Sequence, residues 1–288
     1  MTLIDALSSN PALLTFAAVL LGLIVGSFLN VVILRLPRMM EQAWRQEARE
    51  ILELPPADEP ALSLLRPAST CPQCGTAIRP WHNVPVLGWL WLRGRCASCG
   101  TRISVQYPLV ELASGVLAGL CAVKFGWSAQ LAAALVFTWV LLTLAVIDLR
   151  TTLLPDNLTL PLLWLGLALS LVPVFAVPEA AIVGALAGYL SLWLVFQGFK
   201  LLTGKEGMGY GDFKLLAAVG AWLGWSALPM VILLSSLVGA VVGIGMILLL
   251  RHDRRVPIPF GPYLAAAGWL GMMYGETLKG AYFSAVGL

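Results

Sequence analysis

The stretch LLTFAAVLLGLIVGSFLNVVIL, residues 13–34, carries no charged side chain and is long enough to cross a lipid bilayer as a helix. A spanning segment is helical because lipid offers no hydrogen-bond partner to an open backbone, and it needs about 20 mainly apolar residues because the hydrocarbon core is about 30 Å thick. Arg35 and Arg38 follow at once. The stretch has no basic segment before it and no small-residue cleavage site after it, and it is too long for the apolar part of a signal peptide. It therefore predicts a first transmembrane helix that is retained.

The whole chain shares this apolar character. Of its 288 residues, 59% are hydrophobic and 11% are charged, whereas an ordinary soluble domain has about 25% charged residues. Too few polar side chains are present to cover a single water-soluble globule. Further apolar runs lie near residues 108–125, 129–147, 158–176, 180–199, 212–224, 227–250 and 261–278. We therefore expect an all-α polytopic membrane protein with about eight transmembrane helices.

The basic residues predict how these helices are oriented, because lysine and arginine gather on the cytoplasmic side of a membrane. With the N terminus outside, all 18 lysines and arginines except Lys124 and Lys279 fall on the cytoplasmic side or at the inner helix ends. The basic cluster at 251–255 is cytoplasmic only if the short 212–224 run also crosses the membrane. We therefore keep that span and expect a multi-pass protein of the cytoplasmic membrane.

One long segment outside the membrane follows the first helix, so we divide the chain into residues 1–34, 35–107 and 108–288. The first part of this segment, RMMEQAWRQEAREILELPPADEP at 38–60, is charged and helix-prone until Pro55 and Pro56. Such a pattern is typical of an amphipathic helix. We expect it to form a solvated helix that lies on the membrane surface.

The second part of the segment, CPQCGTAIRPWHNVPVLGWLWLRGRCASCG at 71–100, contains two C-x-x-C pairs. A glycine follows each pair, which lets the backbone turn so that both sulfurs face one ion. Two such pairs at nearly this spacing indicate a zinc site, and four thiolates close its tetrahedral shell, so the metal would be structural. The predicted ligands of this small cytoplasmic zinc-knuckle segment are Cys71, Cys74, Cys96 and Cys99.

Disulfides and a redox pair are the alternatives to zinc. Disulfides are rare in the reducing cytoplasm, where the topology places this segment. Redox sites seldom occur as two matched pairs. His82 is not needed as a ligand, and Cys121 lies within a predicted span, where a small apolar packing role is the simplest explanation.

Four carboxylates near predicted spans need an explanation, because an acidic residue at a helix centre costs roughly 2.5–3.5 kcal/mol. They are Glu111, Asp148, Asp156 and Asp212. The topology puts Asp148, at the end of the third span, and Asp212, at the start of the sixth, at the cytoplasmic face. Structural explanations also exist: Asp148 can pair with Arg150, and Asp212 and Asp156 can cap helices. The sequence leaves the role of Glu111 open.

Two aspartates brought together at a water-accessible membrane edge can hydrolyse a peptide bond. Two carboxylates a few ångströms apart share a proton, because their charges repel. The ionised group then takes a proton from water, and the protonated group polarises the carbonyl that the water attacks. A proton or ion carrier is the alternative, but it needs its carboxylates near the middle of the bilayer.

The stretch GMGYGDFKLL, residues 207–216, brings glycines directly before Asp212. Backbone without Cβ atoms can adopt unusual dihedral angles and lets an extended substrate approach closely. A nucleotide-binding loop is not indicated, since no strand precedes the glycines and no GK[ST] follows them. The pattern favours a peptide-binding edge beside Asp212, and we expect no nucleic-acid partner.

These motifs resemble the GxGD membrane aspartic proteases, and within them the type IV prepilin peptidase family. Besides GMGYGDFKLL and the two cysteine pairs, the similar stretches are GSFLNVVILRLP at 26–37, ISVQYPLVELASG at 103–115, LPD at 154–156 and PIPFGPYLA at 257–265. The resemblance covers nearly the whole chain. It is closest to the four-cysteine, bifunctional form of Gram-negative type IV pilus and type II secretion systems.

The resemblance implies catalytic aspartates at Asp148 and Asp212, motif glycines at Gly209 and Gly211, and zinc at the four cysteines. It implies removal of the short basic leader of prepilins and pseudopilins after a glycine, at the cytoplasmic face of the bacterial inner membrane. The bifunctional members then methylate the new N terminus with S-adenosylmethionine. No motif places the methyl donor, and residues 35–107 are its expected region by elimination. Trp81, Trp89 and Trp91 there could line a pocket or anchor the segment at the headgroups.

Other proteases fit less well. A presenilin-like protease would carry tyrosine before the first aspartate, whereas Ile147 precedes Asp148, and it would not need the cysteine segment. Rhomboid-type serine proteases and site-two metalloproteases are disfavoured, because the chain contains neither GxSG nor HExxH.

Overall fold

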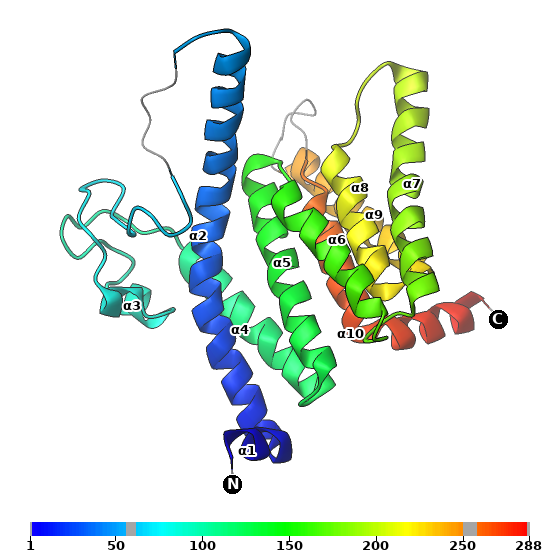
Figure 1. The fold of residues 1–288 in the computed structure, drawn as a ribbon, viewed down its shortest axis with the longest axis horizontal. Helices are drawn as coiled ribbons and strands as arrows, with labels where there is room; N and C mark the ends of the chain where they lie inside the picture. Colours follow the sequence, from blue (N-terminus) through cyan, green and yellow to red (C-terminus); the bar gives the residue numbers. More distant parts are fainter. Residues whose placement is uncertain (1, 56–61, 250–257, 287–288) are drawn as a thin grey trace. The chain divides into compact units, whose positions relative to one another are not determined.

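The computed structural model describes residues 2–55, 62–249 and 258–286, and helices make up most of them (Figure 1). The described residues contain no sheet, only two isolated β-bridges, Thr70 with Ala77 and Arg95 with Arg102. The predicted all-α class is therefore confirmed. The basic cluster at 251–255 and Pro56 lie outside the described residues.

The chain forms two compact units, Met1–Trp127 (unit 1) and Ser128–Leu288 (unit 2). The helices of unit 1 are α1 (Leu3–Ser9), α2 (Pro11–Ile51), η1 (Pro80–Asn83), α3 (Leu87–Trp91) and α4 (Gln106–Phe125). The helices of unit 2 are α5 (Ala129–Thr151), α6 (Asp156–Ser170), α7 (Pro178–Thr203), α8 (Tyr210–Leu223), η2 (Trp225–Ala227), α9 (Leu228–Leu249) and α10 (Gly261–Val286).

Helix α2 is much longer than a membrane span. Its start is capped by Asn10, whose side chain accepts the N–H groups of Ala12 and Leu13, both at 3.1 Å. The helix then continues through Pro37 for 41 residues, or about 60 Å at ~1.5 Å per residue. The helix expected within residues 38–60 is present up to Ile51, but it is not a separate element, because residues 38–51 extend α2. Pro37 removes a single hydrogen bond, and the helix-forming residues after it continue the helix.

Small residues let α2 and α4 pack closely within unit 1. A Cβ atom on Gly22 would lie 2.6 Å from the Ser114 carbonyl oxygen, and one on Gly26 would lie 2.8 Å from the Glu111 Cα. The Ser114 hydroxyl donates to the Gly22 carbonyl at 2.5 Å. This pattern of small residues four apart, with a polar bond across the contact, is typical of helix pairs in membranes.

Helix α8 is the core of unit 2. It contacts α6, α7 and α10, and Figure 1 shows it among its neighbours. The backbones of α7 and α8 touch where Gly184 meets Gly220, so neither position has room for a side chain. Trp222 packs against Phe137 and donates its indole N–H to the Leu162 carbonyl at 2.7 Å. The short α8 is thus buried by protein rather than exposed to lipid.

Five segments of the described chain are long and apolar enough to cross a membrane, by length and composition. They are α2, α4, α5, α7 and residues 225–246, which include most of α9. Each of the other predicted spans overlaps a helix, α6, α8 or α10, but α6 and α8 have only 15 and 14 residues. The count of eight spans therefore stays a prediction.

Candidate active site

Asp148 lies near the end of α5 and is 4% exposed. Its Oδ2 accepts the backbone N–H of Gly261, the first residue of α10, at 2.9 Å. A Cβ atom on Gly261 would lie 2.7 Å from that oxygen, so only glycine lets the carboxylate approach the backbone this closely. The described residues show no ion pair between Asp148 and Arg150. The start of α10 holds this carboxylate.

Asp212 lies in the first turn of α8 and is 8% exposed. The N-cap residue of α8 is Gly209, and no side chain caps the helix. The alternative explanation of Asp212 as a helix cap is therefore wrong. Its Oδ1 is buried and has no hydrogen-bond partner among the described residues. An unpaired buried carboxylate oxygen is costly and is typical of functional sites.

Leu154 packs against the glycines that lie beside the two aspartates. A Cβ atom on Gly211, next to Asp212, would lie 2.6 Å from the Leu154 Cβ, and one on Gly261, which binds Asp148, would lie 3.0 Å from the Leu154 Cδ2. The structure thus brings together the two residues that the sequence singled out, and their repulsion allows them to hold one proton between them.

The glycines before Asp212 differ from expectation in one respect. None of Gly207, Gly209 and Gly211 has a positive φ, so the predicted unusual dihedral angles are wrong. The close approach is present at Gly211, where a side chain would collide with Leu154. At Gly209 a Cβ atom would make only an ordinary contact, 3.9 Å from the Asp212 Oδ2. Gly211 is therefore required by packing beside the site.

Asp156 has a role that the sequence did not indicate. The N-cap of α6 is Pro155, and Asp156 makes no capping bond, so the predicted cap at this residue is wrong. Its carboxylate instead binds the Lys214 ammonium group at 2.7 and 2.8 Å. Lys214 lies two residues after Asp212 on α8, so this ion pair joins the starts of α6 and α8.

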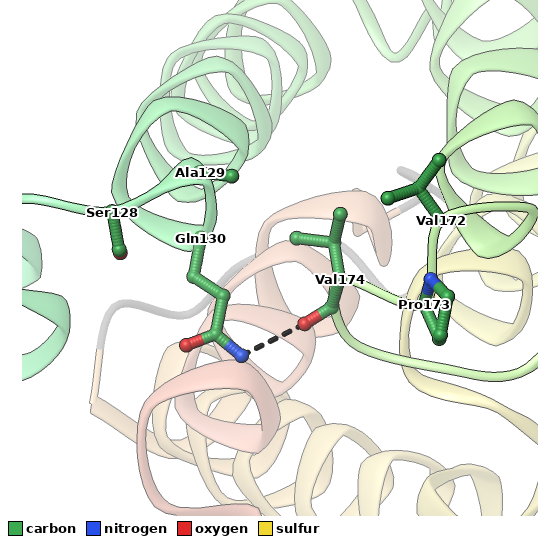
Figure 2. Close-up of a pocket in the computed structure, with 6 residues that line it drawn as sticks. All are labelled: Ser128, Ala129, Gln130, Val172, Pro173 and Val174. Carbon is green, nitrogen blue, oxygen red and sulfur yellow. Dashed lines mark hydrogen bonds between the residues drawn. The ribbon is translucent and has the colours of Figure 1, made fainter.

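A pocket of about 330 Å³ lies elsewhere in unit 2 (Figure 2). It is lined by residues 128–130 and 172–174, and the Gln130 side chain donates to the Val174 carbonyl at 2.8 Å across it. Gln130 is at the start of α5 and Asp148 is near its end, about 27 Å away along the helix. The pocket is therefore separate from the aspartates.

The two cysteine pairs of unit 1 fold into matching turns. The N–H of Gly75 donates to the Cys71 carbonyl at 2.9 Å, and that of Gly100 donates to the Cys96 carbonyl at 3.0 Å. Both glycines have positive φ, 69° and 72°, which residues with a side chain rarely adopt. The glycine after each pair is thus required by the turn, as the sequence predicted.

The two turns bring four sulfurs together. The Sγ atoms of Cys71, Cys74, Cys96 and Cys99 all lie within 4.8 Å of one another, and those of Cys71 and Cys99 are 3.8 Å apart. A tetrahedral zinc ion with bonds of ~2.3 Å holds its sulfurs about 3.8 Å apart. Hydrogen bonding to Thr76 lowers the pKa of the Cys74 thiol to about 6, which favours the thiolate that a metal binds. The cluster therefore fits a metal ion.

The tryptophans of this segment divide into two kinds. Trp89 donates its indole N–H to the Ile103 carbonyl at 3.2 Å and packs against Gly94, so it supports the fold of the segment. Trp81 and Trp91 are exposed. The two predicted roles, pocket lining and headgroup anchor, stay predictions for the three tryptophans.

Comparisons with known proteins agree with this division of the chain. Residues 20–125 match the bacterial peptidase A24 N-terminal domain, and residues 135–244 match the type IV leader peptidase family. A protein of Stutzerimonas stutzeri is 54% identical over 98% of both chains, and one of Pseudomonas aeruginosa is 53% identical over 100% of this chain and 99% of its own. Both are named prepilin leader peptidase/N-methyltransferase. The chain belongs to the type IV leader peptidase family.

A further relative in this type IV leader peptidase family, from Xanthomonas campestris, carries the same name at 50% identity over 98% of this chain and 99% of its own. The resemblance found in the motifs is thereby confirmed. No solved structure matches the chain. The sequence analysis did not single out Gly261 and Lys214, although both lie in motifs quoted there. A motif does not show which distant residues its own residues contact.

Proposed function

We propose that the chain removes the basic leader of type IV prepilins and type II secretion pseudopilins after a glycine, and then methylates the new N-terminal residue. The relatives that carry the corresponding name are about half identical over nearly the whole chain. The observation that carries the cleavage proposal is the buried pair Asp148 and Asp212 where α5, α8 and α10 meet. We assign both aspartates as catalytic, with Gly209 and Gly211 as the motif glycines.

Cleavage by this pair needs no covalent intermediate. The ionised aspartate takes a proton from water as the water oxygen bonds to the carbonyl carbon, and the protonated aspartate donates to the carbonyl oxygen. The tetrahedral intermediate then collapses, the C–N bond breaks, and the leaving amine receives a proton from the pair. The low exposure of both carboxylates keeps bulk water out and strengthens these interactions.

The proposal includes eight transmembrane helices in the bacterial inner membrane, with the aspartates facing the cytoplasm. Residues 1–34 supply the first helix, residues 35–107 the cytoplasmic methyltransferase region and residues 108–288 the peptidase core. The distribution of lysine and arginine supports this topology. Prepilins, pseudopilins and membrane lipid are the expected partners.

Zinc is the proposed metal of the cysteine cluster. The ligands would be Cys71, Cys74, Cys96 and Cys99, and when bound the ion would join the two turns without a free coordination position. The proposed methyl donor is S-adenosylmethionine, which supplies a methyl group on a sulfonium sulfur. When bound, it would supply this methyl group to the new N-terminal amine, which would release one proton.

Mass spectrometry of a pilin tests the whole proposal. A type IV prepilin is co-expressed with the chain in a bacterium that lacks its own prepilin peptidase, and the pilin N terminus is measured. We expect loss of the leader and one added methyl group with the wild-type chain, and an intact leader with Asp148→Asn. A pilin that keeps its leader in the presence of well-expressed wild-type chain would contradict the proposal.

A further inference from the structure

Unit 1 contains a buried carboxylate that peptide cleavage does not use. Glu111 lies in the second turn of α4 and is 7% exposed. Its Oε2 accepts the backbone N–H of Val86 at 2.7 Å. No cationic side chain pairs with Glu111 in the part of the chain that the structure describes. A buried carboxylate without a cation is unusual, because removing its charge from water is costly.

The bond to Val86 explains why an acceptor is needed at position 111, but not why that acceptor is a carboxyl group. Val86 is β-branched and has a φ of 62°, an unfavourable conformation that its bond to Glu111 helps to hold. A glutamine could accept the same hydrogen bond without the cost of burying an ionisable group. A carboxyl group at this position therefore points to a cationic partner from outside the chain.

An acceptor without a partner among the described residues lies at the same contact between α2 and α4. Asn30 is 2% exposed, and its Nδ2 donates to the carbonyls of Gly26 and Tyr107 at 3.3 and 3.1 Å. Its Oδ1 has no hydrogen-bond partner among the described residues. Gly26 packs on the Glu111 backbone, and Tyr107 precedes Glu111 by about one turn. Asn30 and Glu111 are thus neighbours on facing helices.

We propose that Asn30 and Glu111 form a binding site for an α-ammonium group and that methyl transfer uses this site. The proposal rests on the methyltransferase function proposed above. An ammonium group offers a positive charge to Glu111 and an N–H donor to the Asn30 Oδ1. Two molecules of the reaction carry such a group: the N terminus of the trimmed pilin and the methionine part of the donor. Val86 contacts Glu111 through its backbone N–H, and Val84 and Leu87 beside it are exposed, so the ligand would reach Glu111 past this segment.

The test uses the purified full-length chain in detergent, with Glu111→Gln and Asn30→Ala. Ser114→Ala is the matched control, because Ser114 is also buried and also bonds across the contact of α2 with α4, but outside the cluster. Leader cleavage and metal content are measured first to show that each variant is folded. S-adenosylhomocysteine, which has an α-ammonium group, is then compared with 5′-methylthioadenosine, which lacks one. A synthetic mature pilin peptide is compared with its N-acetyl form.

We expect Glu111→Gln to weaken recognition of one α-ammonium compound by about 10- to 100-fold, the usual effect of losing a hydrogen bond to a charged group. Weaker binding of S-adenosylhomocysteine but not of 5′-methylthioadenosine assigns the site to the donor. Weaker binding of the free peptide but not of its N-acetyl form assigns it to the pilin. The control binds all four probes like the wild type.

Unchanged binding of every probe by Glu111→Gln would overturn the proposal and leave Glu111 as a neutral acceptor for Val86. If Glu111→Gln does not fold, Asn30→Ala decides the same comparison. Failure of the wild-type chain to methylate the peptide would contradict the proposed function instead, while the difference between the two adenosine compounds still tests the site.

Discussion

The cysteine cluster of unit 1 and the aspartate pair of unit 2 reach their geometry by different routes. Each cysteine pair makes its own turn within residues 70–77 or 95–102, closed by hydrogen bonds between near neighbours. The aspartates come from two helices and depend on a third, since Asp148 is held by the start of α10. Turn chemistry can therefore be predicted from spacing, whereas a site made by helix packing depends on contacts that a motif does not contain.

Asp148→Asn and Asp212→Asn test the aspartate pair of unit 2 most directly. Each should lower leader cleavage by at least about 100-fold, because an amide cannot take or give the proton that hydrolysis needs. Methylation of a synthetic mature pilin peptide should continue, since that reaction needs positioning rather than two carboxylates. Cleavage is measured by gel shift of a prepilin and methylation by mass spectrometry. Substantial cleavage by either variant, or loss of methylation by both, would contradict two separate sites.

Cys71→Ser tests the cluster made by local turns. Purified wild-type chain should carry about one zinc ion, and the variant should lose it, because a closed structural site needs all four thiolates. Limited proteolysis should then cut within residues 62–105, and methylation should fall at least as much as cleavage. Cys121→Ser is the control, since Cys121 lies in α4 outside the cluster. Zinc that remains stoichiometric in Cys71→Ser would rule out four-thiolate binding.

Gly261→Ala tests whether the start of α10 positions Asp148. The new Cβ atom would lie 2.7 Å from the Asp148 Oδ2 and would push the carboxylate away from its backbone donor. A displacement of ~1 Å can cost about 100-fold in rate, so we expect a loss of this order in leader cleavage. Gly198→Ala in α7 is the control, because a Cβ atom there meets nothing within 4 Å. Equal activity of the two variants would show that α10 does not position Asp148.

Asp156→Asn should have the smallest effect. The Asp156–Lys214 pair is partly exposed, and such pairs contribute roughly 0.2–1 kcal/mol to stability. Even if all of this energy were lost from the stabilisation of the transition state, cleavage would fall by no more than about fivefold. A double-mutant cycle with Lys214→Gln, read by thermal unfolding, measures the coupling between the two side chains. A loss of cleavage as large as that of Asp148→Asn would instead place Asp156 among the catalytic residues.

Sequence reasoning succeeded where the physical cause is local. The apolar runs predicted the helices, and the spacing of cysteine and glycine predicted a cluster that the structure confirms. It failed where distant residues decide. The ion pair of Asp156 with Lys214 joins α6 to α8, and its two residues lie far apart in the sequence. The pairing of Asp148 with the backbone of Gly261 was likewise invisible, because it joins residues on α5 and α10.

The length of α2 has a mechanical consequence for the cytoplasmic segment. Residues 35–51 continue the helix for about 25 Å beyond Leu34, the last apolar residue of the predicted span. At the base of this extension, Arg35 donates to the carbonyls of Ser63 and Pro67 at 2.9 and 2.7 Å. Because an unbroken helix is stiff, a change of about 10° in its tilt would move its far end by roughly 4 Å. A change in the tilt of α2 would therefore move Ile51, at its far end, more than the residues near Arg35, to which the chain before the cysteine segment is bonded.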